Sequence, residues 1–254
     1  MARVRALTIA EQRPLTADLV WTALRSAEPI YDVRPGQYLL LNTNEPGGTL
    51  RMLPRVGFIA ASEPALGQLA LVYAPDEPGR AWLARQPVGA SVAAHGIYGR
   101  PFVLDPRART LVLAGIGQGS AALLALARLA QQQRRAVTII LAAASAALLP
   151  PPFLLPADIE YHTVIGDAAD LVAALVPVLP WADQLCAALP PAAVPVLREV
   201  VARQRVRGNT DFASVLLDVP IACGAGYCGT CALALRRETR LLCVDGPVVA
   251  LREV

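Results

Sequence analysis

The sequence predicts a multidomain chain of the β plus α/β class: an N-terminal antiparallel β-barrel, a central doubly wound parallel sheet and a small C-terminal module. Short apolar runs broken by Gly and Pro fill residues 1–104. A strand–turn–helix–strand pattern occupies residues 105–207, and four of the five cysteines lie in residues 208–254. The first pattern is typical of barrels and the second of parallel sheets. These three segments are the predicted domains.

In the first segment, five apolar runs have the length of strands and are separated by turn signals such as Arg34-Pro35-Gly36 and Glu77-Pro78-Gly79. The predicted strands are Leu19–Leu24, Tyr38–Asn42, Val56–Ala60, Leu69–Tyr73 and Ser91–Ala94. Many short strands at this spacing favour an antiparallel barrel.

In the second segment, a continuous apolar strand at Thr110–Ala114 is followed by a glycine-rich run and a helical stretch from Ser120 to Gln133. The next strand, Val137–Leu141, follows directly, which is the order of a doubly wound sheet. Later predicted elements are strands at Ile159–Val164 and Trp181–Cys186 and a helix at Ala193–Arg203.

The third segment contains four cysteines in the order C-x4-C-x2-C-x11-C: Cys223, Cys228, Cys231 and Cys243. This is the spacing by which a loop wraps a 2Fe–2S cluster, in which each iron takes two thiolates. Gly224, Gly226 and Gly229 let the backbone approach such a cluster, because glycine tolerates positive φ and has no side chain to clash. Two short runs, Leu233–Leu235 and Leu241–Val244, predict a hairpin that returns Cys243 to the other three.

Two other uses of these cysteines are open. A structural zinc ion takes four cysteines, but usually as two C-x2-C pairs, and only Cys228 and Cys231 form one. Disulfides belong to small, cysteine-dense secreted domains, whereas this chain has five cysteines in 254 residues. The iron–sulfur interpretation is favoured. Cys186, outside the group, is expected to be a small buried apolar residue.

The composition excludes several classes of protein. Hydrophobic residues make up 55% and charged ones 17%, so the chain is globular, and a net charge of +3 gives no basis for nucleic-acid binding. The longest uncharged stretch, 136–157, is interrupted by prolines 150–152 before it reaches the ~20 residues of a membrane span. The start of the chain has no apolar signal region, so we expect a cytoplasmic protein.

The C-terminal motifs resemble one family. Residues 222–231, followed by Cys243-Val244-Asp245-Gly246-Pro247-Val248, are similar to the cluster loop and closing signature of the electron-transfer subunit of two-component dihydroorotate dehydrogenases, in the ferredoxin-reductase superfamily. The resemblance implies FAD on the barrel, NADH on the central domain and a 2Fe–2S cluster that exchanges electrons with a separate catalytic flavoprotein subunit. It thus implies a hetero-oligomeric oxidoreductase in pyrimidine biosynthesis.

The flavin site implied by the resemblance departs from the family pattern. The Arg-Pro-x-Ser strand reads here Leu53-Pro54-Arg55-Val56, and the following elements read Tyr73-Ala74-Pro75 and Gly79-Arg80. Arg51 or Arg55 is a candidate replacement for the missing arginine, and Arg80 offers a bidentate contact to phosphate. Gly79 precedes an expected helical turn, Arg80–Arg85, whose amides can meet a phosphate. These residues are the candidate FAD site.

The nucleotide site departs further. Gly115, Gly117 and Gly119 follow a strand and open a helix, which is the context of a phosphate loop, although close helix–strand packing demands the same glycines. The Cys-Gly-Pro motif of the family reads Cys186-Ala187-Ala188. These changes argue against tight NAD(P)H binding.

No residue pattern indicates acid–base catalysis in this chain. His95 and His162 have no partner pattern, and Trp21, Trp82 and Trp181 are expected to be packing residues. The sequence therefore favours an electron-transfer subunit. The alternatives are a subunit of another reductase, of the sulfite reductase or hydrogenase type, and a cluster-bearing subunit that has lost flavin or nucleotide binding.

Overall fold

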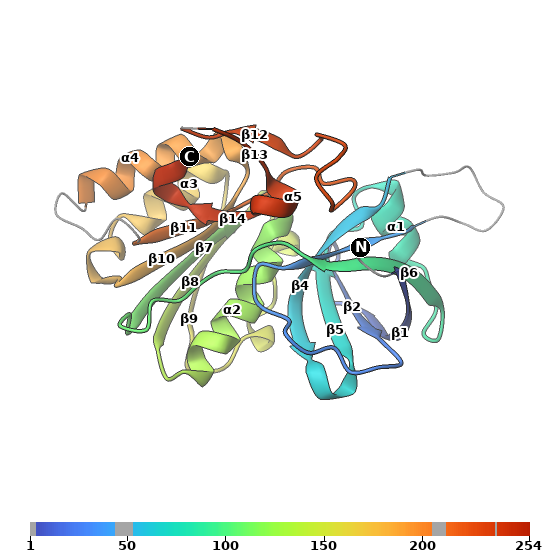
Figure 1. Ribbon diagram of the computed structural model, residues 1–254. Coiled ribbons are helices and arrows are strands. Elements are labelled where there is room, and N and C mark those ends of the chain that lie inside the picture. Colours follow the sequence, from blue (N-terminus) through green and yellow to red (C-terminus); the bar gives the residue numbers. More distant parts are fainter. Residues whose placement is uncertain (1–3, 44–52, 205–211, 237) are drawn as a thin grey trace.

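The computed structural model describes residues 4–43, 53–204, 212–236 and 238–254. Arg51 lies outside the described residues. Figure 1 shows two large bodies side by side, a barrel formed by strands between residues 4 and 98 and a helix-covered sheet, with the C-terminal segment lying over the junction. Within the described residues, no helix has the length and apolar character required to cross a bilayer.

The first body is a closed antiparallel barrel with strand order β1-β2-β5-β4-β3-β6. Its elements are β1 (Val4–Pro14), β2 (Val20–Arg25), β3 (Tyr38–Leu41), β4 (Arg55–Glu63), β5 (Gln68–Tyr73), β6 (Ser91–Tyr98) and, between the last two, helix α1 (Pro78–Ala84). The five predicted strands are present, and β1 is an additional strand that closes the barrel against β6. The predicted barrel is therefore confirmed.

The second body is a six-stranded sheet with order β14-β11-β10-β7-β8-β9. The strands β7 (Thr110–Ile116), β8 (Ala136–Ala143), β9 (Glu160–Ile165), β10 (Gln184–Leu189) and β11 (Ala213–Leu217) are parallel, and β14 (Val248–Ala250) is antiparallel to β11. Helices α2 (Ala121–Gln132), α3 (Ala168–Leu175) and α4 (Val194–Gln204) connect them. The order of the parallel strands reverses between β7 and β10, which is where doubly wound sheets bind ligands.

The C-terminal segment joins the sheet at both ends, through β11 and β14, and forms its own hairpin between them. Strands β12 (Ala232–Ala234) and β13 (Thr239–Leu241) pair antiparallel, so the predicted hairpin is present. Its second strand ends earlier than predicted, because the run Leu241–Val244 falls mainly on α5 (Leu242–Asp245). Both β11 and β14 lie after residue 207 yet belong to the sheet. The predicted division at residues 207 and 208 thus runs through this sheet.

Strand β3 shows why the two bodies pack as one unit. All four of its residues are buried, because successive side chains point to opposite faces of a strand. Leu39 and Leu41 belong to the cluster inside the barrel, whereas Tyr38 and Leu40 belong to the core shared with the sheet. On α2, the half-buried Arg128 donates to the carbonyl oxygen of Ala60 at 2.9 Å and so ties the helix to β4.

Two predictions about single residues have different outcomes. Cys186 is fully buried on β10, as expected for a small apolar residue. The prediction that Trp181 is a packing residue is wrong, because it is 80% exposed in a short 3-10 turn that precedes β10. The strand that was predicted to begin at Trp181 begins at Gln184, where the chain enters the sheet.

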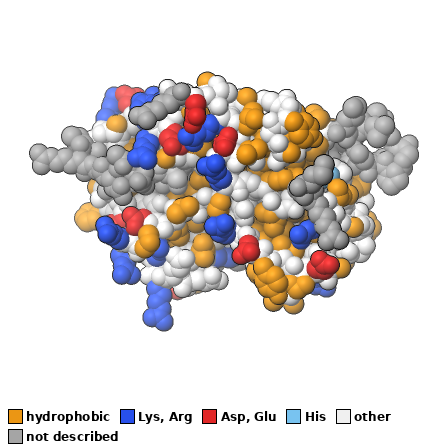
Figure 2. All heavy atoms as spheres, viewed as in Figure 1, with side chains coloured by type: hydrophobic (Ala, Val, Ile, Leu, Met, Phe, Trp, Pro, Cys, Tyr) orange, Lys and Arg blue, Asp and Glu red, His pale blue; other side chains and the backbone are white. Residues whose placement is uncertain are grey.

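Figure 2 shows acidic and basic side chains interspersed on the viewed face.

Candidate functional site

The cysteines lie on a loop between β11 and β12 and on the short helix α5. The loop supplies Cys223, Cys228 and Cys231, and the β12–β13 hairpin brings the chain back so that α5 places Cys243 beside Cys231. The backbone N–H of Cys243 donates to the Sγ atom of Cys231 at 3.3 Å, and the N–H of Leu242 donates to the carbonyl oxygen of Cys231 at 3.2 Å. The hairpin thus brings together two cysteines that lie 12 positions apart in the sequence.

The direct contact between two of these cysteines is the donation from the backbone N–H of Cys243 to the Sγ atom of Cys231. The thiols also lie close enough to shift one another's pKa, because Cys228 acts on Cys223, and both Cys231 and Cys223 act on Cys243. In the part of the chain that the structure describes, no three Cys, His, Asp or Glu side chains form a group around a single ion. A binuclear cluster needs two thiolates on each iron, whereas a tetrahedral zinc ion needs all four sulfurs at one centre.

The four cysteines differ in exposure and in the groups that surround their thiols. Cys231 and Cys243 are 2% and 3% exposed, whereas Cys228 is exposed. Desolvation raises the pKa of the Cys223 thiol, but the backbone N–H groups of Ala225, Cys228 and Tyr227 outweigh it and lower that pKa to about 6. Burial, together with the neighbouring Cys231, raises the pKa of the Cys243 thiol to about 12. Amides directed at sulfur favour the thiolate form.

The cysteine loop rests on aromatic rings of the barrel. Gly224 has φ +65°, and a Cβ atom added there would lie 2.8 Å from the ring of Tyr98 at the end of β6. Tyr98 is tilted against Tyr38, with ring centroids 5.9 Å apart, and the Tyr38 hydroxyl donates to the carbonyl oxygen of Cys243 at 3.5 Å. Burial and the nearby thiols raise the pKa of Tyr38. The barrel therefore supports both ends of the cysteine group.

At the start of α1, the structure gathers several of the predicted flavin-site residues around the carboxylate of Glu77. This carboxylate accepts from the backbone N–H groups of Gly79 and Arg80 at 3.1 and 2.6 Å and from Nε of Arg55 at 2.7 Å. The guanidinium of Arg80 pairs with Asp76 at 2.6 Å. Burial alone would raise the pKa of Glu77, but the hydrogen bonds from Arg55, Gly79 and Arg80 lower it. An anion of the chain itself thus occupies this donor group.

The remaining predicted flavin residues lie on adjoining strands. Leu53 is 58% exposed, and its carbonyl oxygen accepts from Arg55 at 2.7 Å. Pro54 and Val56 flank Arg55 at the start of β4, and Ala74 and Pro75 follow β5. Tyr73, at the end of β5, is 7% exposed and shares a hydrogen bond with Thr22 at 2.9 Å.

Whether this region suits a flavin diphosphate depends on its donors. It holds two guanidinium groups and two backbone N–H groups, a donor set that suits a diphosphate. Behind them, the hydroxyl of Thr43 is buried and has no hydrogen-bond partner among the residues that the structure describes, and a Cβ atom at Gly79 would lie 2.6 Å from it. The residues present therefore fit the group, provided that the carboxylate of Glu77 moves aside.

The predicted glycine loop serves packing at two of its three glycines. Gly115 lies within β7, where a Cβ atom would be 2.7 Å from Leu123 of α2, and at Gly119 it would be 2.7 Å from Leu216. Gly117 has φ +82°, in the left-handed region that favours glycine. The backbone N–H of Gly119 donates to Asp218 at 3.2 Å. Here too a carboxylate of the chain accepts from an amide that a phosphate would need.

Sequence reasoning missed Glu77 and Asp218. An acidic residue before Pro-Gly is a signal for a helix start, because proline is favoured in the first turn and the acid can accept from its free N–H groups. Glu77-Pro78-Gly79 carries that signal. For Asp218 no local signal exists, since it follows β11 and meets the glycine loop across the sheet, 99 positions away from Gly119.

Comparison with known proteins identifies the C-terminal region and the fold. Residues 220–254 match a family model described as the iron–sulfur cluster binding domain of dihydroorotate dehydrogenase B. This match contains all four cysteines of the group. No curated protein matches the sequence.

Solved structures match almost the whole chain. That of an NADH-dependent reduced ferredoxin–NADP oxidoreductase is 19% identical with a TM-score of 0.78, covering 98% of this chain and 89% of that one. Phthalate dioxygenase reductase is 15% identical with a TM-score of 0.65, covering 97% and 95%. The ferredoxin reductase of carbazole 1,9a-dioxygenase is 20% identical with a TM-score of 0.70, covering 84% and 69%.

These likenesses show that the barrel and sheet form a ferredoxin-reductase-like fold. The match over residues 220–254 shows that this segment is similar to the iron–sulfur cluster binding domain of dihydroorotate dehydrogenase B, in agreement with the resemblance of its sequence motifs.

Proposed function

We propose that this chain is the electron-transfer subunit of an oxidoreductase complex and that Cys223, Cys228, Cys231 and Cys243 hold a 2Fe–2S cluster. The observation that carries the proposal is that residues 220–254, which contain all four thiols, match the iron–sulfur cluster binding domain of dihydroorotate dehydrogenase B. The structure supports it by placing the backbone N–H of Cys243 3.3 Å from the Sγ atom of Cys231. Such a cluster takes two thiolates on each iron. When bound, the cluster supplies one-electron chemistry.

The backbone around the thiols would tune the site. N–H groups of Ala225 and Cys243 already donate to the sulfur atoms of Cys223 and Cys231. Hydrogen bonds of this kind stabilise negative charge on sulfur and so influence the reduction potential. The loop residues thus have two roles, holding the irons and setting the electrostatic environment.

A partner would approach at the exposed side of the loop. Cys228 is exposed, Tyr227 is 80% exposed and Val244, next to Cys243, is 50% exposed. Exposed apolar side chains beside a redox centre suit docking of another protein. We infer that the partner is a catalytic flavoprotein subunit of the dihydroorotate dehydrogenase type in a cytoplasmic hetero-oligomer, and that the pathway is pyrimidine biosynthesis.

FAD is proposed as the second cofactor, on the barrel. When bound, a flavin supplies the conversion between two-electron and one-electron transfer that a cluster alone cannot perform. Arg55, Arg80 and the amide of Gly79 would hold its diphosphate, and Tyr73 lies on the adjoining strand. The proposal assigns no acid–base role on a substrate to this chain.

Anaerobic purification followed by iron, sulfide and flavin assays tests the proposal. We expect two irons and two sulfides per chain, with a signal from a reduced 2Fe–2S cluster in electron paramagnetic resonance. A colourless, zinc-containing protein would contradict it. A protein that co-purifies identifies the partner and distinguishes the dihydroorotate type from the sulfite reductase and hydrogenase types.

The second candidate is a cluster-bearing subunit without a flavin. The observation that favours it is the carboxylate of Glu77, which accepts from the donors that a diphosphate would use. The same assays separate the two candidates, because iron and sulfide without FAD indicate the second one.

A further inference from the structure

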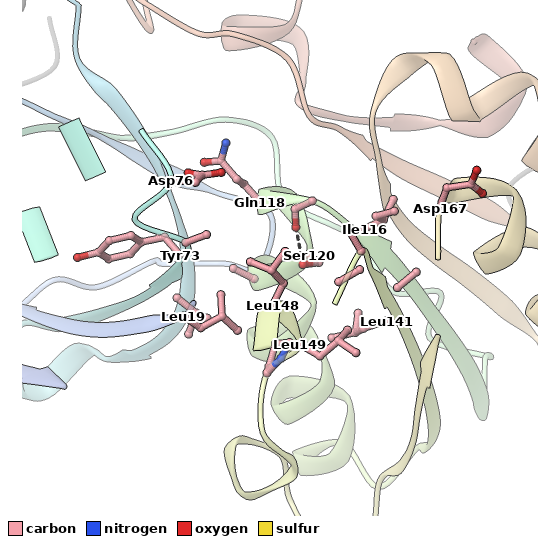
Figure 3. Close-up of a pocket in the computed structure, with 18 of the residues that line it drawn as sticks. Leu19, Tyr73, Asp76, Ile116, Gln118, Ser120, Leu141, Leu148, Leu149 and Asp167 are labelled. Atoms are coloured by element: carbon pink, nitrogen blue, oxygen red, sulfur yellow. Dashed lines mark hydrogen bonds between the residues drawn. The ribbon is translucent and has the colours of Figure 1, made fainter. Parts of the chain in front are cut away.

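A cavity of about 380 Å³ lies between the barrel and the sheet, at the carboxyl ends of β7 and β8 (Figure 3). Its volume lies within the range typical of pockets for small molecules. Most of its wall is aliphatic. The large apolar side chains are Leu19, Val72, Ile116, Leu141, Leu148 and Leu149.

The charged groups of the lining are acidic. Among the described residues that line the cavity, the charged ones are Asp76 and Asp167, and none carries a positive charge. Figure 3 places Asp76 beside Gln118 at one side of the cavity and Asp167 at the other. The charge of Asp76 is compensated by its ion pair with Arg80 at 2.6 Å, so a ligand with phosphate groups would meet repulsion mainly at Asp167.

The two hydroxyl groups of the wall already have partners within the chain, whereas the side-chain amide of Gln118 adds a polar group to the lining. The Ser120 hydroxyl donates to the carbonyl oxygen of Gly117 at 2.6 Å, and the Tyr73 hydroxyl is paired with Thr22. The carboxylate of Asp167 caps α3 by accepting from backbone N–H groups in its first turn. In the neighbouring glycine loop, the backbone N–H of Gly119 already donates to Asp218, so this donor is not free to bind a phosphate.

We propose that this cavity binds an uncharged, largely apolar small molecule and does not accept a nicotinamide dinucleotide. The aliphatic wall gains from covering an apolar ligand, whereas a diphosphate would lose its hydration with no cationic side chain among the described lining residues to replace it. The proposal concerns binding in this cavity alone, so its failure and that of the cluster assignment are distinguishable: one is read from ligand binding and the other from iron content.

The test uses the full chain, the neutral apolar dye Nile red and NADH. Ala143 lines the cavity at the end of β8 and is only half-buried, so Ala143→Trp fills the cavity without removing a core side chain. The matched control is Ala65→Trp, at an exposed position on the barrel. We expect one dye site per chain, weakened about tenfold or more by Ala143→Trp and unchanged by Ala65→Trp.

A second variant, Leu148→Asp, adds a negative charge to the wall and is expected to weaken dye binding as well. Circular dichroism checks that each variant is folded. The proposal is overturned if folded Ala143→Trp and Leu148→Asp bind the dye as the unaltered chain does. It is equally overturned if NADH displaces the dye, or if NADH binds and that binding is lost in Ala143→Trp.

Discussion

The cysteine loop and the start of α1 are both places where backbone N–H groups gather, but their acceptors differ. In the loop, the N–H groups of Ala225 and Cys243 donate to cysteine sulfurs, which are the atoms that would bind iron. At α1, the N–H groups of Gly79 and Arg80 donate to the carboxylate of Glu77. A motif thus indicates a ligand more securely when its side chains bind the ligand directly. Backbone N–H groups are a weaker indication, because a side chain of the protein can accept their hydrogen bonds instead.

The largest effect is expected from Cys228→Ser. Removing one thiolate leaves one iron with a single cysteine, so we expect iron and sulfide content to fall to near zero. The barrel stays folded, because Cys228 is exposed and outside the core. Iron and sulfide assays measure the loss, and circular dichroism measures the fold.

The matched control is Cys186→Ala, since Cys186 is buried on β10 outside the group. It should keep the iron content of the unaltered chain. Unchanged iron in Cys228→Ser, or equal loss in both variants, would contradict the ligand assignment.

The next effect separates backbone strain from packing in the same loop. Gly224 and Gly229 have φ +65° and +73°, so alanine at either costs about 1 kcal/mol of strain. Only at Gly224 does the added Cβ atom meet the ring of Tyr98, at 2.8 Å, while at Gly229 it meets open space. We expect Gly224→Ala to lower the free energy of unfolding by about 1–3 kcal/mol more than Gly229→Ala does.

Urea denaturation of the two variants, with iron content measured in parallel, gives this difference directly. Equal losses in the two variants would show that Tyr98 does not support the loop.

The α1 region gives the next effect. In Glu77→Gln the negative charge that competes with a diphosphate is gone, while Arg55 and Arg80 remain, so we expect FAD to bind about tenfold more tightly. Quenching of flavin fluorescence measures the affinity. Glu63→Gln, at the exposed end of β4, is the control. Unchanged affinity in Glu77→Gln would mean that the carboxylate does not occupy the diphosphate position.

The difference in stability between the unaltered chain and Glu77→Gln depends on pH in a defined direction. Because the folded-state pKa of Glu77 lies below its ordinary value of 4.5, its ionised form stabilises the fold. That contribution, about 1 kcal/mol for a side chain that is a quarter exposed, is complete above pH 4.5 and is lost as the pH falls through the folded-state pKa. The unaltered chain should therefore exceed Glu77→Gln in stability at neutral pH and converge with it in acid, as denaturation at several pH values would show.

The fold was predictable from the sequence where the pattern is local. The apolar runs of Tyr38–Leu41 and Thr110–Ala114 identified strands. The assignment of the four cysteines as iron ligands stays a prediction from their spacing. Strand β1 was not predicted, because its charged and polar residues obscure the alternation of apolar and polar side chains. The strand becomes evident only from its pairing with β2 and β6. The positions of Glu77 and Asp218 depend on contacts made after the chain has folded.

The smallest effect is expected where the barrel and α5 meet through exposed side chains. Arg100 and Asp245 form an ion pair at 3.4 Å with the arginine 61% exposed, and such pairs contribute less than about 1 kcal/mol. The backbone N–H of Arg100 also donates to the carbonyl oxygen of Gly246, and this bond does not depend on the side chain. Arg100→Gln should therefore change the unfolding free energy by less than ~1 kcal/mol and leave iron content unchanged. A fall in iron content would show instead that the cysteine group depends on this ion pair, because α5 carries both Asp245 and Cys243.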